Sequence, residues 1–253
     1  MLFPTLEFAL FFIIVLIGSW CLNPWIGALR SWLLLGSYFF YAWYKPSDLY
    51  VLLGISVLAW IFGGLIYRVQ AAGTKALLLW LGCCGFLGVL VFYKYMGFLV
   101  TLLPAPWWDP QSQWAAHFVQ PELPLGISFI TFHAISLLFD SYRGKLHAAP
   151  GLSQVLLYVS FFPQLIAGPI LRAAHFLPQL GRSPQIEHIK ITRAMILITL
   201  GLFQKVIIAN YLGVHLVDPV FSGQDSQQSA LLAVYGYAIQ IFCDFCGYTH
   251  IAI

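Results

Sequence analysis

The feature that most constrains this chain is a series of apolar stretches, each long enough to cross a lipid bilayer. A transmembrane helix needs roughly 20 apolar residues. Hydrophobic residues make up 60% of the 253 residues and charged residues only 8%, which is too little polarity to cover a water-soluble domain. The sequence therefore predicts an all-α fold, a polytopic transmembrane helix bundle that forms a single membrane domain over residues 1–253. The seven predicted spans are residues 6–22, 29–44, 48–67, 76–95, 125–142, 193–210 and 229–253.

Charge and cysteine usage exclude two other classes of site. The net charge is +3 and the twelve basic residues are spread along the loops, unlike the clustered basic face of a nucleic-acid-binding protein. All five cysteines lie in apolar stretches, and Cys243 and Cys246 form a C-x-x-C pair without a second pair. We interpret these cysteines as packing residues. No metal site, bound cofactor or nucleic-acid partner is expected.

The basic residues predict how the chain is oriented, because Lys and Arg in short loops favour the cytoplasmic side. Residues 96–124 and 211–228 contain no Lys or Arg and are predicted to be loops on the outer side. The first of these loops carries three tryptophans, and forms either a shelf around an outer opening or a simple aromatic belt at the interface. The basic residues on the other side are Arg30, Arg68, Lys75, Arg143, Lys145, Arg172, Arg182, Lys190 and Arg193.

Residues 152–170 form a further apolar segment that does not read as a span. Basic residues flank it on both sides, and Pro163, Gly168 and Pro169 interrupt its backbone hydrogen bonding. Such a broken backbone is tolerated at membrane depth only where protein or a water-filled cavity shields it. We therefore predict a re-entrant segment that lines an internal chamber, with Gln164 among its lining residues.

Several polar residues lie within or next to the apolar stretches, where charge is costly and marks candidate functional sites. Arg172 follows the Gly-Pro break and either binds the phosphate or carboxylate of an anionic donor or serves as a cytoplasmic anchor. His133 is either a chamber residue or a hydrogen-bonded core histidine. Asp140, near an interface, is expected to pair with a basic residue. Lys205 either extends to the interface or faces the bundle interior.

The last predicted span combines a carboxylate and a phenol. Asp244 and Tyr248 are four residues apart and therefore share one helix face. They either line a polar chamber or pair internally to fix helix packing. Gly247 allows a neighbouring helix or ligand to approach closely. His250 is suited to acid–base chemistry, but the sequence offers it no carboxylate partner.

Four segments, in this order, resemble the membrane-bound O-acyltransferase family, and in particular its bacterial branch that acetylates exported polysaccharides such as alginate. The resemblance covers nearly the whole chain, including MLFPTLEFALFF and SYFFYAWYKPSDLYVLL near the start. The four segments are PLGISFITFHAISLLFDSYRG, FFPQLIAGPILRAAHFLPQL, GLFQKVIIANYLGVHLVDPVF and YAIQIFCDFCGYTHIAI.

This resemblance implies a helical bundle in the bacterial inner membrane around a chamber that is open to both faces. An acyl group from a cytoplasmic thioester, acetyl-CoA or another, would pass to a polysaccharide acceptor with the help of periplasmic acetyltransferase partner proteins. The family's essential histidine follows the D-F-x-G-Y motif by a few dozen residues, which places it beyond Ile253. We therefore expect this chain to be the N-terminal portion of such an enzyme and inactive by itself.

Some positions depart from the family pattern. His133 stands where Gln or Glu is common, Asn210 where Asp is common, Cys246 where Ser is usual, and His250 where an acidic residue is usual. These departures bear on the substrate more than on the family. Two other functions stay open: a transporter or export-pore component, since broken helices and buried carboxylates also occur there, and a scaffold that only docks a periplasmic partner.

Overall fold

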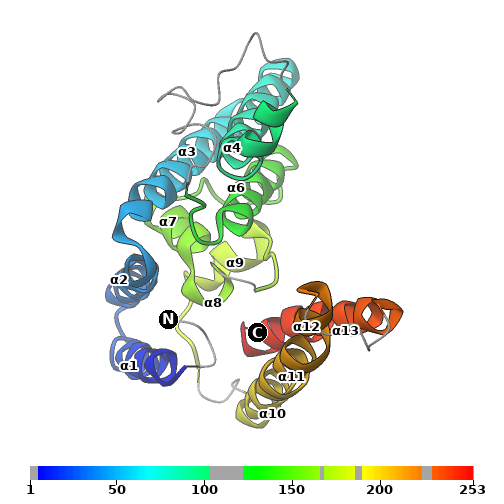
Figure 1. Ribbon diagram of the computed structural model, residues 1–253. Helices are drawn as coiled ribbons and strands as arrows, with labels where there is room; N and C mark the ends of the chain where they lie inside the picture. The colour runs from blue at the N-terminus through cyan, green and yellow to red at the C-terminus, as the bar shows by residue number, and fades with distance from the viewer. Residues whose placement is uncertain (1–4, 103–121, 166–167, 186–189, 224–229, 253) are drawn as a thin grey trace. The chain divides into compact units, whose positions relative to one another are not determined.

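The computed structural model of the protein describes residues 5–102, 122–165, 168–185, 190–223 and 230–252. Within these ranges the chain forms helices joined by turns, and none of these residues belongs to a β-strand (Figure 1). The all-α prediction is confirmed. The predicted tryptophan shelf, Trp107, Trp108 and Trp114, lies outside the described residues, while residues 96–101 continue helix α4.

Two compact units make up the chain. The large unit comprises Gly18–Ile166 and Ile170–Ser183, and the hairpin unit comprises Met1–Ile17, Ala167–Pro169 and Pro184–Ile253. Helix α1 (Leu6–Cys21) crosses the division between them.

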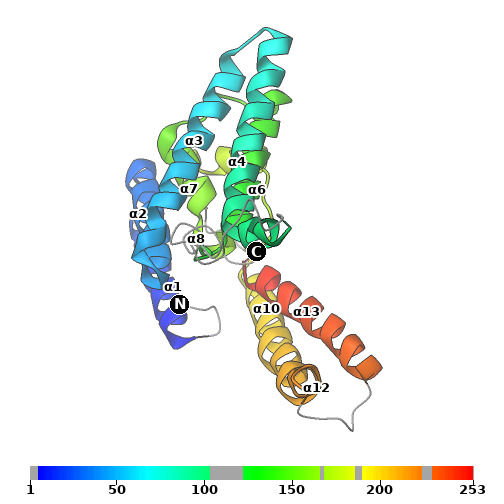
Figure 2. The same cartoon turned by 45° about the horizontal axis from the view of Figure 1, so that its top comes forward.

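Three long helices form the centre of the large unit, and both views show them side by side (Figures 1 and 2). They are α3 (Leu49–Arg68), α4 (Ala72–Thr101) and α6 (Ile127–Tyr142). Small residues bring them close, which matters in lipid because burial against another helix gains little over burial in hydrocarbon. A Cβ added to Gly63 would lie 3.3 Å from Leu137, so the glycine on α3 provides the room that this α6 side chain occupies.

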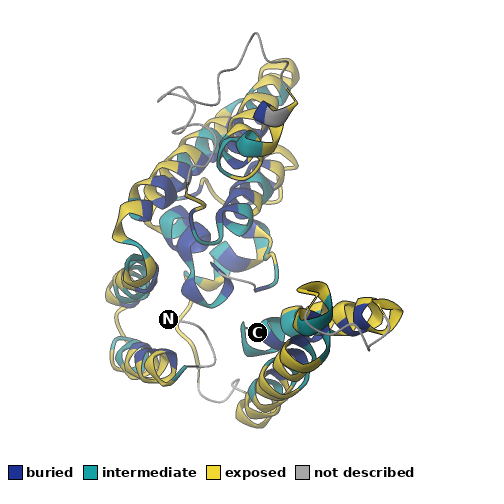
Figure 3. Ribbon diagram, in the orientation of Figure 1, coloured by how far each residue is buried: buried dark blue, intermediate teal, exposed yellow. Residues whose placement is uncertain are grey.

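The outward faces of these helices are apolar and exposed (Figure 3). Leu65, Trp80 and Leu81 are 43%, 66% and 53% exposed. Large exposed apolar side chains along whole helices are expected where lipid is the solvent. In the same unit, helix α2 (Ile26–Tyr44) packs on α7 (Leu152–Ser160).

The segment predicted to be re-entrant, residues 152–170, contains two short helices, α7 and α8 (Phe162–Leu165), and a third, α9 (Ala173–Gln179), follows it. The nine residues of α7 rise only about 14 Å, less than half of the ~30 Å hydrocarbon core, so α7 cannot cross it alone. A hydrogen bond ties α8 to helix α2, because the Phe162 N–H donates to Ser37 Oγ at 3.3 Å. Five of the nine α7 residues are buried, which suits broken backbone shielded by protein.

The hairpin unit consists mainly of a long helical rod and α13 (Ala230–Ala252). The rod runs from Ile191 to Phe221 as α10 (Ile191–Leu202), a π-helical segment (Phe203–Ala209), α11 (Asn210–Leu212), a second π-helical segment (Gly213–Val217) and α12 (Asp218–Phe221).

The prediction of an outer loop from residue 211 was wrong, because residues 211–221 are helical. The predicted span ended at residue 210, and the stretch after it contains the acidic Asp218 and Pro219. Proline at the first turn of a helix costs no hydrogen bond, however, and Pro219 holds that position in α12. Residues 222 and 223 form a turn.

One line of buried residues runs straight along the rod on the side that faces α13. Gly201, Ala209, Gly213 and Val217 are buried, and they are spaced by multiples of four residues. In a regular α-helix each step of four residues turns the face by about 40°. The wider turns of the π-helical segments offset this rotation, so the buried stripe stays in line.

Helices occupy all seven segments predicted to span the membrane. Four helical stretches within the described residues are long and apolar enough to cross a bilayer: Pro46–Arg68, Ala72–Val100, Ile191–Phe221 and Ala230–Ala252. Leu6–Cys21 and Ile127–Tyr142 are shorter apolar helices. The chain is therefore a multi-pass membrane protein.

Candidate functional site

The hairpin unit contains an ion pair between Lys205 and Asp244. Lys205 lies in the first π-helical segment and Asp244 on α13, and the ammonium contacts carboxylate Oδ1. Their side chains are 15% and 37% exposed. Charge within an apolar helix is costly unless it is paired, so this pair decides which faces of the rod and α13 meet.

Tyr248 adds a phenol to the pair. It lies one turn beyond Asp244 on α13, and Lys205 Nζ lies 5.1 Å from the centre of its ring. This distance is within the range of a cation–π contact, which adds to the attraction from the carboxylate. Lys205, Asp244 and Tyr248, called here the lysine cluster, therefore place a cation, an anion and a hydroxyl group together.

Two glycines allow the backbones to meet beside the lysine cluster. A Cβ on Gly201 would lie 2.6 Å from the Gly247 carbonyl oxygen, and a Cβ on Gly247 would lie 2.8 Å from the Gly201 carbonyl oxygen and 3.1 Å from Lys205 Cβ. Neither position has room for a side chain. The predicted role of Gly247 in close approach is confirmed for a neighbouring helix.

A second polar contact joins the same two elements. His250 Nδ1 lies 2.8 Å from Gln204 Oε1. Because an amide oxygen only accepts, this contact places the imidazole proton on Nδ1. Gln204 and Lys205 are adjacent in the π-helical segment, and such segments are often found at functional sites.

His133 lies in the interior of the large unit. Its side chain on α6 is 2% exposed, and Nδ1 lies 2.8 Å from the Phe129 carbonyl oxygen. Its Nε2 is buried and has no hydrogen-bond partner among the described residues. The Tyr158 ring meets it edge-on at 5.4 Å. His133 is thus only half satisfied, with one buried acceptor nitrogen left over.

The broken segment contributes a second buried acceptor. Gln164 on α8 is 5% exposed, and its Oε1 has no partner within the described part of the chain. Pro163 lies in the same short helix and is half-buried, Gly168 is buried and Pro169 half-buried. Arg172 is exposed.

Known proteins with similar sequences are named for acyl transfer. The chain is 31% identical over 254 residues to the peptidoglycan O-acetyltransferase of Helicobacter pylori, covering 88% of this chain and 47% of that protein. It is 34% identical over 262 residues to the probable alginate O-acetylase AlgI of Pseudomonas aeruginosa, covering all of this chain and 48% of that protein. Over its whole length the chain resembles the membrane-bound O-acyltransferase family.

A more distant relative is the teichoic acid D-alanyltransferase of Bacillus subtilis, 30% identical over 137 residues, which cover 51% of this chain and 33% of that protein. No family model matches the chain. The chain spans about half the length of the curated acetyltransferases it matches.

Sequence reasoning identified part of the candidate site. It found Asp244, Gly247 and Tyr248, which lie on α13 in the hairpin unit. For Lys205 it left two orientations open, and it did not select Gln204. The cation turns inward to Asp244.

The expected partner of Asp140 was wrong. Its Oδ2 accepts a hydrogen bond from the Ala174 N–H at 2.9 Å, so the carboxylate holds the start of α9 and pairs with no basic side chain among the described residues. No group of three or more His, Cys, Asp or Glu side chains in those residues could hold a metal ion.

Proposed function

We propose that the chain forms part of a membrane O-acyltransferase, acting as an O-acetyltransferase, in the bacterial inner membrane. It would pass an acyl group from a cytoplasmic thioester, such as acetyl-CoA, across the bilayer to an exported polysaccharide. The observation that carries this proposal is the lysine cluster: a paired carboxylate and a phenol within apolar helices of a chain that resembles this family. Because the chain spans about half the length of its relatives, these residues are assigned part of the chamber, and transfer by the 253-residue chain alone is not expected.

The names of the relatives support acyl transfer to an envelope polymer. Two are named for O-acetyl transfer with peptidoglycan and alginate, and a third for D-alanyl transfer with teichoic acid. The shared feature of these names is an acyl group joined to a polymer. We extend this feature, and not any one polymer, to the present chain, and propose periplasmic acetyltransferase proteins as its partners.

The reaction breaks the acyl C–S bond and forms an acyl C–O bond, while the acceptor hydroxyl loses a proton and the thiol gains one. A hydroxyl nucleophile needs a base for this step. Asp244 is engaged in the ion pair with Lys205, so we do not assign it the role of that base. We assign Asp244 and Tyr248 the positioning of polar groups in the chamber, with the base in the histidine that the resemblance places beyond Ile253.

A charge-removal series separates function from helix packing. Asp244→Leu alone leaves the Lys205 cation unpaired and disrupts the hairpin. The double variant Lys205→Met with Asp244→Leu removes both charges, and such apolar replacements of ion pairs are often neutral for stability. Asp218→Asn, an exposed acid on the same rod, is the matched control.

The assay is ester-linked acetate on exported polymer from cells in which the gene carries each change. If the cluster serves the reaction, the double variant accumulates in the membrane at the normal level but retains less than a tenth of the acetate. Normal acetate in the double variant would show that the ion pair only fixes packing. Unchanged acetate after deletion of the gene would overturn the proposed function itself.

A transporter or export-pore component is the second candidate, favoured by the broken helices α7 to α9 and by charge within the rod. Solute flux through liposomes that contain the protein, without any acyl transfer in cells, would favour it. The names of the similar proteins support the transferase.

A further inference from the structure

Four cationic side chains lie where the three central helices of the large unit end. One is in the last turn of α3, one is in the first turn of α4, and two follow α6 within three residues. Loop charge predicts that this end faces the cytoplasm. The four residues, called here the cationic end, are Arg68, Lys75, Arg143 and Lys145.

Aromatic rings of α6 hold two of these cations in place. Lys75 Nζ lies 5.7 Å from the centre of the Tyr142 ring, which joins the start of α4 to the end of α6. The guanidinium carbon of Arg143 lies 5.8 Å from the centre of the Phe139 ring. Both distances are within the range of a cation–π contact. The two charges are therefore positioned together at the end of α6.

No acidic side chain among the described residues compensates the cationic end. The large unit has three acids in the part of the chain that the structure describes. Asp48 and Glu122 both contact Lys45, and buried Asp140 accepts from the Ala174 N–H at 2.9 Å. All three acids are thus engaged elsewhere, and the positive charge is available to an anion from outside the chain.

Helix α6 is too short to cross the hydrocarbon core. Its 16 residues rise about 24 Å, against a core of ~30 Å and about 45 Å for the 30 residues of α4. A Cβ on Gly63 would lie 3.6 Å from Ser141 Oγ, so α3 continues to Arg68 beyond the level at which α6 ends. Figures 1 and 2 both show the α3–α4 connection extending past α6. The short helix leaves a step, into which the polar surface of the membrane is drawn.

An apolar strip leads from this step along α6. Phe132, Ile135, Phe139 and Tyr142 are spaced by three, four and three residues and therefore share one helix face. The three aromatic side chains are 43%, 38% and 37% exposed, and Ile135 is half-buried. A fatty acyl chain lying along this strip would bring its headgroup to the cationic end.

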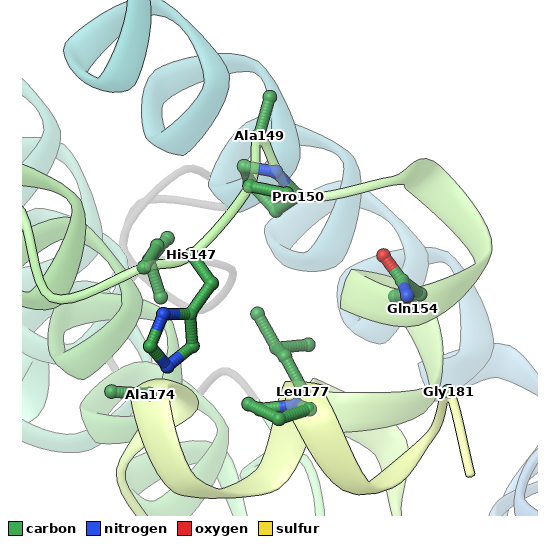
Figure 4. A pocket seen from close by; sticks show the side chains of 10 residues that line it. His147, Ala149, Pro150, Gln154, Ala174, Leu177 and Gly181 are labelled. Atoms are coloured by element: carbon green, nitrogen blue, oxygen red, sulfur yellow. The ribbon is translucent and has the colours of Figure 1, made fainter.

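The connection from α6 to α7 packs elsewhere and leaves this strip open. Trp60 Nε1 on α3 donates to the Pro150 carbonyl at 3.1 Å. Figure 4 shows His147 of the connection across from Leu177 of α9, and a cavity of about 190 Å³ lies between them. The lining of that cavity, which includes Gln154, contains no residue of the cationic end or of the strip.

We propose that the cationic end and the apolar strip together bind one anionic phospholipid of the membrane. The phosphate would lie between Lys75 and Arg143, with the Tyr142 hydroxyl as a hydrogen-bond donor, and an acyl chain would lie along Phe132 and Phe139. A soluble anion or an acidic soluble protein would meet the same charge, but neither would use the strip below it. This site does not depend on the proposed function, because it requires no acyl transfer.

The first test measures phosphatidylglycerol binding to the purified full chain in uncharged detergent by native mass spectrometry, with phosphatidylcholine as the uncharged lipid. Loss of one cation beside an anionic lipid should weaken binding about fivefold, and loss of two roughly 25-fold. These losses are expected for Lys75→Gln and for Lys75→Gln with Arg143→Gln, while phosphatidylcholine binding stays unchanged. The matched control is Lys94→Gln, because Lys94 is also on α4 and lies 5.6 Å from the centre of a tyrosine ring.

The comparison uses variants that keep their melting temperature in this detergent. Arg143→Gln, at an exposed position, gives the reading by itself if Lys75→Gln does not fold, and should also weaken binding about fivefold. Equal losses in Lys75→Gln and Lys94→Gln would show a general response to charge and would overturn the site. Unchanged phosphatidylglycerol affinity in the double variant would also overturn it and leave the cations to another partner, such as an acidic protein.

The second test separates a lipid from a soluble phosphate. Phe132→Ala removes part of the strip and should weaken phosphatidylglycerol binding about threefold to tenfold, whereas Phe98→Ala, at an exposed phenylalanine of α4, should not. Glycerol phosphate carries the headgroup charge without acyl chains and should bind at least about a hundredfold more weakly than the lipid. If it competes as well as the lipid does, or if Phe132→Ala binds like Phe98→Ala, the lipid assignment is wrong.

Discussion

The start of α6 offers a sharp test of how the broken segment is held against the long helices. Gly126 has a φ of +66°, a conformation that favours glycine, and a Cβ there would run into the Leu165 carbonyl oxygen of α8. Gly144, just past the other end of α6, has a φ of +65° but nothing within 4 Å of a Cβ. The two glycines thus share a backbone strain and differ in a steric contact.

This difference gives the expected magnitudes. Alanine in the left-handed conformation costs about 1–2 kcal/mol at either position. Only Gly126→Ala also has to move a packed backbone, which adds about 1–3 kcal/mol. One kcal/mol lowers the melting temperature by roughly 2–4 °C in a protein of this size. The melting temperature should therefore fall by about 2–8 °C in Gly144→Ala and by about 4–20 °C in Gly126→Ala.

The assay is thermal unfolding of both purified variants in the same detergent, followed by tryptophan fluorescence. Polymer acetylation should fall in Gly126→Ala, because α8 carries Gln164, and stay near normal in Gly144→Ala. Equal melting temperatures in the two variants would refute the contact between the start of α6 and α8.

The remaining predictions concern α9, the hairpin unit and α4. Asp140→Ala leaves the Ala174 N–H without its acceptor and should cost about 1–3 kcal/mol in unfolding, while Asp140→Asn should cost less because its amide oxygen still accepts. An equal loss in both variants would contradict this role. Gly247→Ala should destabilise by about 1–3 kcal/mol because of the Gly201 carbonyl. Gly85→Ala on α4, with open space around it, should be neutral or stabilise by up to about 1 kcal/mol, as unfolding in detergent would show.

The sequence was sufficient to predict the helices because apolar length is a local property. Each predicted span coincides with a helix, and the break around Pro163 was visible in the order of its residues. The extension of the rod through Asp218 was missed because a window of roughly 20 apolar residues ended the predicted span at residue 210. An acidic residue and a proline are both compatible with helix at the first turn of α12.

Partners far apart in the chain could not be predicted in the same way. Lys205 and Asp244 are 39 residues apart, and periodicity on one helix says nothing about which face of another helix it meets. Asp140 was expected to pair with a basic side chain. The N–H groups at the start of a neighbouring helix also bind carboxylates, and Asp140 accepts from such a group.

The π-helical segments have a consequence for how the rod tolerates insertions and deletions. An extra residue accommodated in a wide turn is equivalent to a one-residue insertion, so loss of a residue such as Val206 would restore ordinary winding. Gly213 and Val217 would then keep nearly their present phase toward α13, because the wide turn had absorbed the extra residue. The ordinary helix α10 has no wide turn to lose, so a one-residue deletion there would rotate everything after it by about 100° and carry Lys205 and Gly213 away from α13.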